Sequence, residues 1–135
     1  MVIVVASGNI FRRELTSYIL AEVGHEVYEA RTVEELMGAL RARAPDMIVL
    51  DQQVERADPA ATLRAVRLLS EAPIVWIGEP ARLGTLLNGD RRPAGAVAWP
   101  FRADEILDVV AGLSERVNGG LVKLAVGEHY ARPGE

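Results

Sequence analysis

The stretch Ala-Pro-Asp-Met-Ile-Val-Leu-Asp, residues 44–51, limits the possible folds of this chain more than any other part of the sequence. Its centre, Met47 to Leu50, is apolar throughout, which is typical of a strand buried on both faces of a parallel sheet. Pro45 ends the helical pattern before it, because proline cannot continue a helix interior. Asp51 follows directly, so the sequence predicts a carboxyl group at the carboxyl end of a buried strand.

Strand and helix patterns alternate on both sides of this stretch. Further strands are predicted at residues 2–5, 27–28, 74–77 and 96–98, and helices at residues 10–23, 33–44, 59–69, 82–88 and 103–117. Thr32 with Glu35 reads as a capping box, and Asp58-Pro59 as a helix start with proline in the first turn. The first helix carries apolar residues at helical spacing, namely Ile10, Phe11, Leu15, Ile19, Leu20 and Val23. The residues predicted to face inward from the third helix are Leu63, Val66, Leu69 and the further candidate Leu68.

Strict alternation of strands and helices favours a doubly wound α/β fold, with helices on both faces of a parallel sheet. Five strands in 135 residues suggest the flavodoxin-like order 2-1-3-4-5, with a ligand site at the carboxyl ends of the strands. Residues 1–117 are expected to form this domain. Residues 118–135 are expected to be a C-terminal tail of unknown role, in which residues 121–126 fit a strand or a helix equally.

Composition excludes several classes of function. Half of the residues are hydrophobic, a quarter are charged and none is cysteine, so the chain has material for a core but no thiol chemistry. The net charge of −4 and a pI near 5.3 argue against a nucleic-acid-binding face. No apolar run approaches the ~18 residues of a membrane span, and the N-terminus lacks the features of a signal peptide. The chain is therefore expected to be cytoplasmic, without nucleic acid or membrane partners.

Two segments resemble the receiver domain of bacterial two-component response regulators. Residues 44–51 look like the family's approach to its phosphoacceptor strand, and Trp99-Pro100-Phe101 looks like the turn after its fifth strand. Residues 24–30 are also similar to the start of the family's second strand, and the likeness runs from residue 2 to about 117. The resemblance implies phosphoryl transfer to one aspartate. That chemistry uses an acidic pair for Mg²⁺, a hydroxyl after the fourth strand and a lysine, because charge develops on the transferring group.

Most of these functional positions carry other residues in this chain. The position of the acidic pair falls on Ala6 and Ser7, or on Ser7 and Gly8 if the alignment slips by one. The acceptor aspartate falls on Asp51. The hydroxyl position falls on Gly78, the lysine position on Trp99, and the position of the aromatic three residues before that lysine on Ala96. Counting the acidic pair as one feature, only Asp51 survives of five. The sequence therefore predicts no metal site and no cofactor.

Asp51 has two interpretations at this point. It is either a phosphoacceptor or an inherited carboxylate hydrogen-bonded to loop N–H groups. The resemblance implies that the backbone carbonyl of Gln53 would be a neutral metal ligand. Lys123, in the tail, and Arg102, at the start of the last helix, are both poorly placed to replace the lysine.

Other side chains near the predicted strand ends also have alternatives. Glu55, Asp58 and Glu79 are expected in solvated loops rather than in the pocket. Trp99 either caps the space that a phosphoryl group would occupy or packs on the last helix, and the peptide bond before Pro100 is expected to be cis, as in the family. Trp76 is expected to be core.

The leading hypothesis is a degenerate receiver, or pseudo-receiver, that acts in signal transduction as a phosphorylation-independent binding module and not as an enzyme. Its partner would be a protein or a second copy of the chain. The resemblance places that contact on the face made by the fourth helix, fifth strand and fifth helix. Two alternatives stay open: a working phosphoacceptor with a rebuilt site around Asp51, and a small-ligand sensor.

Overall fold

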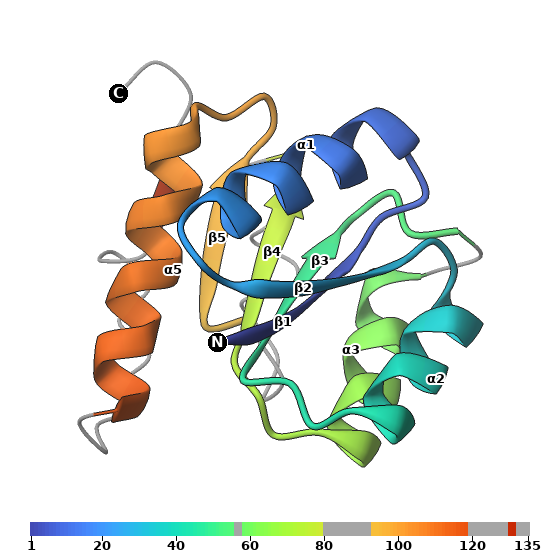
Figure 1. Ribbon diagram of the computed structural model, residues 1–135. Coiled ribbons are helices and arrows are strands. Elements are labelled where there is room, and N and C mark those ends of the chain that lie inside the picture. Colours follow the sequence, from blue (N-terminus) through green and yellow to red (C-terminus); the bar gives the residue numbers. More distant parts are fainter. Residues whose placement is uncertain (56–57, 80–92, 119–129, 132–135) are drawn as a thin grey trace.

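The computed structural model describes residues 1–55, 58–79, 93–118 and 130–131 (Figure 1). The strands are β1 (Val2–Ala6), β2 (Glu26–Ala30), β3 (Met47–Asp51), β4 (Ile74–Gly78), β5 (Gly95–Ala98) and β6 (Tyr130–Ala131). The helices are α1 (Ile10–Glu22), α2 (Val33–Ala42), α3 (Pro59–Leu69) and α5 (Ala103–Asn118). The helix predicted at residues 82–88 lies outside the described residues.

All neighbouring strands pair in parallel, in the order β2-β1-β3-β4-β5-β6. The predicted order 2-1-3-4-5 is therefore confirmed. The tail adds what the sequence did not predict, a two-residue strand β6 paired with β5. Helices α1 and α5 lie on one face of the sheet, and α2 and α3 cover the other (Figure 1).

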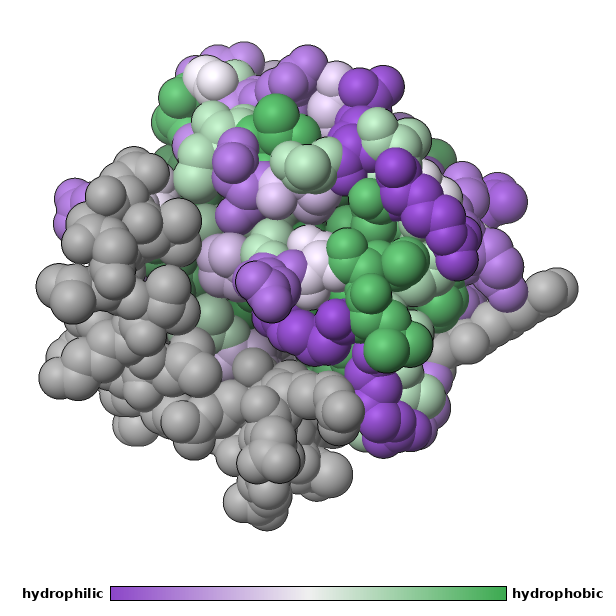
Figure 2. All heavy atoms as spheres, turned by 90° about the horizontal axis from the view of Figure 1, so that it is seen from below, coloured by the Kyte–Doolittle hydropathy of each residue, from purple (hydrophilic) through white to green (hydrophobic). Residues whose placement is uncertain are grey.

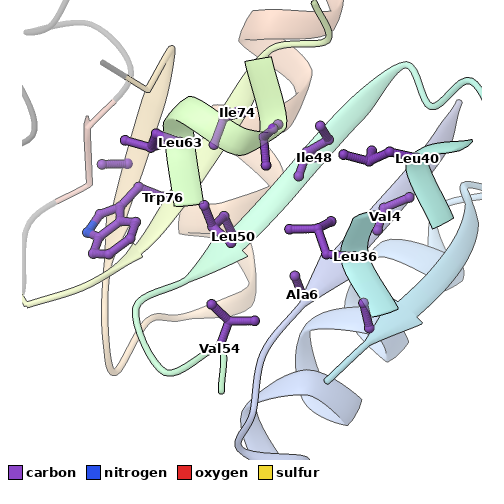
Figure 3. Packing of buried hydrophobic residues seen from close by; sticks show 13 residues of the cluster. Val4, Ala6, Leu36, Leu40, Ile48, Leu50, Val54, Leu63, Ile74 and Trp76 are labelled. Carbon is purple, nitrogen blue, oxygen red and sulfur yellow. The ribbon is translucent and has the colours of Figure 1, made fainter. Parts of the chain in front are cut away.

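The core consists of two clusters, one on each face of the sheet. Figure 3 shows the cluster under α2 and α3, in which Leu36 and Leu63 meet Leu50 and Trp76 from the central strands. The other cluster joins α1 and α5 to the opposite face of the same strands. Trp76, predicted as core, is only 2% exposed. Within the described residues, no helix has the length and apolar character needed to span a membrane.

Two predicted helix starts are observed. The Thr32 side chain accepts a hydrogen bond from the Glu35 N–H group at 3.1 Å, which is one half of the predicted capping box. Pro59 stands in the first turn of α3, and Asp58 is the N-cap residue, although its side chain makes no capping hydrogen bond.

The inward face of α1 follows the apolar spacing of the sequence only in part, because Leu20 is buried and Ile19 packs against the core but other apolar residues of the set face solvent. Its buried residues are Arg12, Thr16, Ser17 and Leu20, while Ile10, Phe11 and Val23 are each more than half exposed. Residues 12, 16 and 20 share one stripe of a helix because they are four apart, and Ile10 and Phe11 point elsewhere. The spacing of apolar residues does not predict the buried face of α1, because the polar side chain of Arg12 lies on that face.

The prediction for the end of α3 is also wrong in part. Leu63 and Val66 are buried as expected, but Leu68 is 86% exposed and Leu69 is 38% exposed. Leu68 follows Leu63 by five residues, which turns it to the solvent side of the helix. Apolar residues also reach the surface among charged ones on the face that Figure 2 shows.

Candidate functional site

The candidate site lies where β1 and β3 end side by side. Ala6, the last residue of β1, pairs with Leu50 of β3. The residues that follow them, Ser7 and Asp51, therefore lie side by side at the carboxyl edge of the sheet. The Ser7 hydroxyl donates a hydrogen bond to Asp51 Oδ2 at 3.0 Å. Both side chains are buried, and Asp51 is only 2% exposed. The predicted carboxylate is thus present, but it is enclosed by protein.

Arg12 reaches the same carboxylate from α1. Its Nε atom lies 2.8 Å from Asp51 Oδ2, and both side chains are more than nine-tenths buried. The other oxygen, Oδ1, accepts a hydrogen bond from the Gln53 N–H group at 2.9 Å. Asp51 therefore has a hydroxyl, a guanidinium and a backbone N–H group around it, all supplied by this chain.

The start of α1 fixes Arg12 in this position. Asn9 is the N-cap, and its side chain accepts a hydrogen bond from the Arg12 N–H group at 3.0 Å. On the outer side, the guanidinium carbon lies 4.5 Å from the centroid of the Trp99 ring, the geometry of a cation–π contact. Trp99 in turn packs edge-to-face against Phe101 and Phe11, at centroid distances of 5.2 and 6.4 Å.

The sequence did not identify Arg12 as a cation near the strand ends; the two candidates to replace the lysine were Arg102 and Lys123. The sequence does contain a pattern that places Arg12 on the inner side of the helix. Asn9 is a good N-cap residue, and Arg12, Thr16 and Leu20 recur after it at intervals of four, which puts them on one face. Arg102 lies on the surface with Asp104 and Glu105, and Lys123 is outside the described residues.

Burial raises the pKa of the Asp51 carboxyl above its usual value of 3.8, and the Gln53 N–H group, the Arg12 guanidinium and the Ser7 hydroxyl offset part of this rise. The folded protein therefore binds a proton at Asp51 more tightly than the unfolded chain does. A group with this shift favours folding most below the unfolded pKa, and that contribution is lost as pH rises through the folded pKa.

We therefore expect the stability of the native protein, relative to Asp51→Asn, to fall as pH rises above the usual aspartate pKa and through the raised pKa of folded Asp51. The amide resembles the protonated acid, so the two proteins should be similar at the acidic end, and the Asn form should be the more stable by up to about 1 kcal/mol at neutral pH. Urea unfolding at several pH values measures this difference. A difference that instead grows in favour of the native protein would show that the ion pair outweighs burial.

The other receiver positions are filled by small groups or by packing. A Cβ atom at Gly78 would lie 2.5 Å from Gln52 Oε1 and 2.8 Å from Trp76 Nε1, so these two side chains occupy the space of a hydroxyl-bearing residue. Ala96 is buried and stands next to Trp76 in the sheet register. The indole of Trp76 thus lies beside the position where receivers have an aromatic residue.

Trp99 is half-buried and packs against the cluster on the α1 and α5 side. It also covers the guanidinium of Arg12, a contact that the sequence did not predict. The peptide bond before Pro100 is cis, as predicted.

The residues at these strand ends do not fit a Mg²⁺ ion. Ala6 and Ser7 supply no carboxylate, and the oxygens of Asp51 already face Arg12, Ser7 and the Gln53 N–H group. The carbonyl of Gln53, which the resemblance implies as a ligand, accepts a hydrogen bond from the Gly8 N–H group at 2.8 Å. In the part of the chain that the structure describes, no group of three or more His, Asp or Glu side chains is arranged so that it could hold a metal ion.

The three loop carboxylates considered from the sequence lie on the surface. Glu55, Asp58 and Glu79 are all exposed. None of them contributes to the surroundings of Asp51 that the structure describes.

No protein-family model and no curated protein matches the sequence. Solved structures do match. The receiver domain of NtrX from Brucella abortus has a TM-score of 0.76 and 27% identity, over 85% of this chain and 98% of that one. A two-component response regulator from Clostridium difficile has a TM-score of 0.79 and 20% identity, over 87% and 98%. The chemotaxis response regulator CheY4 of Vibrio cholerae has a TM-score of 0.75 and 20% identity, over 83% and 97%. The chain therefore has the receiver fold of response regulators, which supports a role in signal transduction.

Proposed function

We propose that this chain is a pseudo-receiver, which binds a protein partner in a signalling pathway without being phosphorylated and has no catalytic activity of its own. One observation carries the proposal: the only carboxylate at the acceptor position, Asp51, is 2% exposed and is held by Arg12 within the protein.

An acceptor aspartate must present a free oxygen to the incoming phosphorus atom, roughly in line with the leaving group. In this chain Arg12 and Ser7 face one oxygen of Asp51, and the Gln53 N–H group binds the other. Trp99 lies over Arg12 on the outer side. The positive charge of Arg12 balances Asp51 and is therefore not available to a transferring phosphoryl group.

The residues that would report a phosphorylated state are replaced as well. Gly78 offers no hydroxyl, and Ala96 offers no aromatic ring that could change position. A ligand shifts a conformational equilibrium only through differential affinity for the two states. Without these groups, the proposed module presents a fixed surface instead of a switched one.

Exposed apolar side chains favour a protein partner or a second copy of the chain. Ile10 and Phe11 are 61% and 65% exposed, and Phe11 packs against Trp99 at the mouth of the site. Exposed apolar groups that cluster in this way are typical of interaction surfaces. The face expected from the resemblance includes β5 and α5, but its remaining part lies outside the described residues.

The test is capture of partners from native lysate by the immobilised protein, with and without Mg²⁺ and a small phosphodonor. We expect the native form and Asp51→Asn to bind the same protein with affinities that agree within about twofold in all four conditions. A phosphodonor-dependent change of about tenfold in the native form, absent from the Asn form, would contradict the proposal.

A second candidate is a phosphoacceptor with a rebuilt site. The proximity of Arg12 to Asp51 favours it, because a guanidinium can stabilise developing negative charge as a metal ion does. The burial of Asp51 argues against it. The phosphodonor arms of the same experiment distinguish the two candidates.

A further inference from the structure

The two edges of the sheet are protected in different ways. Among the described strands, β2 forms one edge and β6 forms the other. An edge strand presents unpaired N–H and C=O groups to which another chain can pair, and charged side chains or a very short edge strand discourage such pairing. On β2, Glu26 and Glu29 are exposed carboxylates. The β2 edge is therefore guarded by charge.

Strand β5 has no such protection of its own. Its sequence, Gly-Ala-Val-Ala at residues 95–98, carries no charge and no proline, and all four residues are buried. One side of β5 pairs with β4. The other side is occupied by β6, in the register Ala96 with Tyr130 and Val97 with Ala131. The tail strand thus covers an edge that would accept another chain if it were open.

The strand that covers β5 is short and is the last described element of the chain. It pairs with β5 through two residues only, and each backbone hydrogen bond contributes little net free energy. We therefore expect β6 to leave and rejoin β5 more readily than the longer strands leave the sheet. An element of this kind can be exchanged between two identical chains while its pairing is kept.

We propose that the β5 edge is a strand-addition site whose second occupant is β6 of another copy of this chain, so that two chains exchange their tail strands. The other copy supplies the same residues, and the pairing of Ala96 with Tyr130 and of Val97 with Ala131 forms between chains in the register seen within one chain. Exchange competes with the intramolecular contact, whose effective concentration is roughly millimolar for a short connection. The dimer therefore becomes prominent as the chain concentration approaches that value. This inference does not rest on the proposed function, because it involves neither Asp51 nor a phosphodonor.

The first test opens the edge and offers it a free strand. In the full chain, Tyr130→Pro/Ala131→Pro removes both N–H groups of β6 and should free the β5 edge. A synthetic peptide with the sequence of residues 126–135, added during a two-dimensional NMR titration, should then cause saturable shifts of the Ala96 and Val97 amides with a Kd of about 1 mM. The native chain should need at least about threefold more peptide, because its own β6 competes.

The same peptide with both prolines in place is the control, and it should cause no shifts at Ala96 or Val97. If the unmodified peptide causes no saturable shifts in the open variant, or the same shifts at equal concentrations in both chains, the proposal is overturned.

The second test measures the oligomeric state directly and needs no variant for its main outcome. Sedimentation equilibrium of the native chain, from about 10 µM to about 1 mM, should show a dimer fraction that rises with concentration. Tyr130→Pro/Ala131→Pro should stay monomeric, because it can accept a strand but cannot donate one. Tyr130→Val/Ala131→Val keeps both N–H groups and should dimerise like the native chain. A native chain that is monomeric at every concentration, or a proline variant that dimerises equally, would rule out strand exchange.

Discussion

Replacing Arg12 with alanine should lower the free energy of unfolding by about 3 kcal/mol. The substitution removes the cation that pairs with a buried carboxylate, and breaking a buried pair from one side is strongly destabilising. It also removes the cation–π contact with Trp99 and leaves a gap under that ring. Asp51 limits the loss because it can take up a proton, so its pKa should rise further in this variant.

Asp51→Asn is the informative counterpart, because it should change stability at neutral pH by no more than about 1 kcal/mol. The carboxylate that it removes is itself penalised by burial, as the raised pKa of Asp51 shows. The two substitutions differ because an amide at position 51 can still accept hydrogen bonds from the Ser7 hydroxyl and the Gln53 N–H group, whereas alanine at position 12 leaves the carboxylate without its cation. Arg31→Ala serves as the control for both, because its ion pair with Glu35 at 3.7 Å is more than half exposed and should contribute less than about 0.5 kcal/mol. Urea unfolding of the four proteins measures these values, and an Arg12→Ala loss no larger than the Arg31→Ala loss would show that the buried pair has no structural role.

Gly8→Asp should lower the free energy of unfolding by about 2–3 kcal/mol, although it returns a carboxylate to one of the two alignments of the acidic pair. A Cβ atom at position 8 would collide with the carbonyl oxygen of Gln53 and lie 2.8 Å from Glu55 Cγ. The loops after β1 and β3 would have to separate, which breaks the hydrogen bond from the Gly8 N–H group to that carbonyl.

The matched control is Gly38→Asp. A Cβ atom at position 38 meets nothing within 4 Å, and aspartate and glycine differ little inside a helix, so this variant should stay within about 0.5 kcal/mol of the native protein. Urea unfolding separates the two variants. If Gly8→Asp is as stable as Gly38→Asp, the loops after β1 and β3 can move apart enough to accept a carboxylate at position 8.

Most of the fold follows from local patterns. The strand at residues 47–50 is recognisable because every residue is apolar, and the Asp58-Pro59 pair places the start of α3 correctly. Strand β6 could not be predicted, because a two-residue strand is too short to show any periodicity and depends on pairing with β5.

The candidate site was predictable in part. Asp51 stands out because a carboxylate ends an apolar strand, but its partner Arg12 comes from a helix of mixed composition in which the apolar spacing does not mark that arginine. Ile10 and Phe11 suggested a hydrophobic inner face, and only the charge at the end of β3 explains why Arg12 is turned inward instead. The side chain of Gln52 fills the space beside Gly78. This could not be predicted, because no sequence pattern indicates where that side chain points.

The central claim is that the chain has a receiver fold whose acceptor position is closed by its own arginine. Intact mass spectrometry after incubation with Mg²⁺ and acetyl phosphate tests it most directly, with Asp51→Asn treated in parallel. We predict that the native protein gains no phosphoryl group and that the two spectra show the same mass change, if any. A near-stoichiometric gain of one phosphoryl group by the native protein, absent from Asp51→Asn, would contradict the claim.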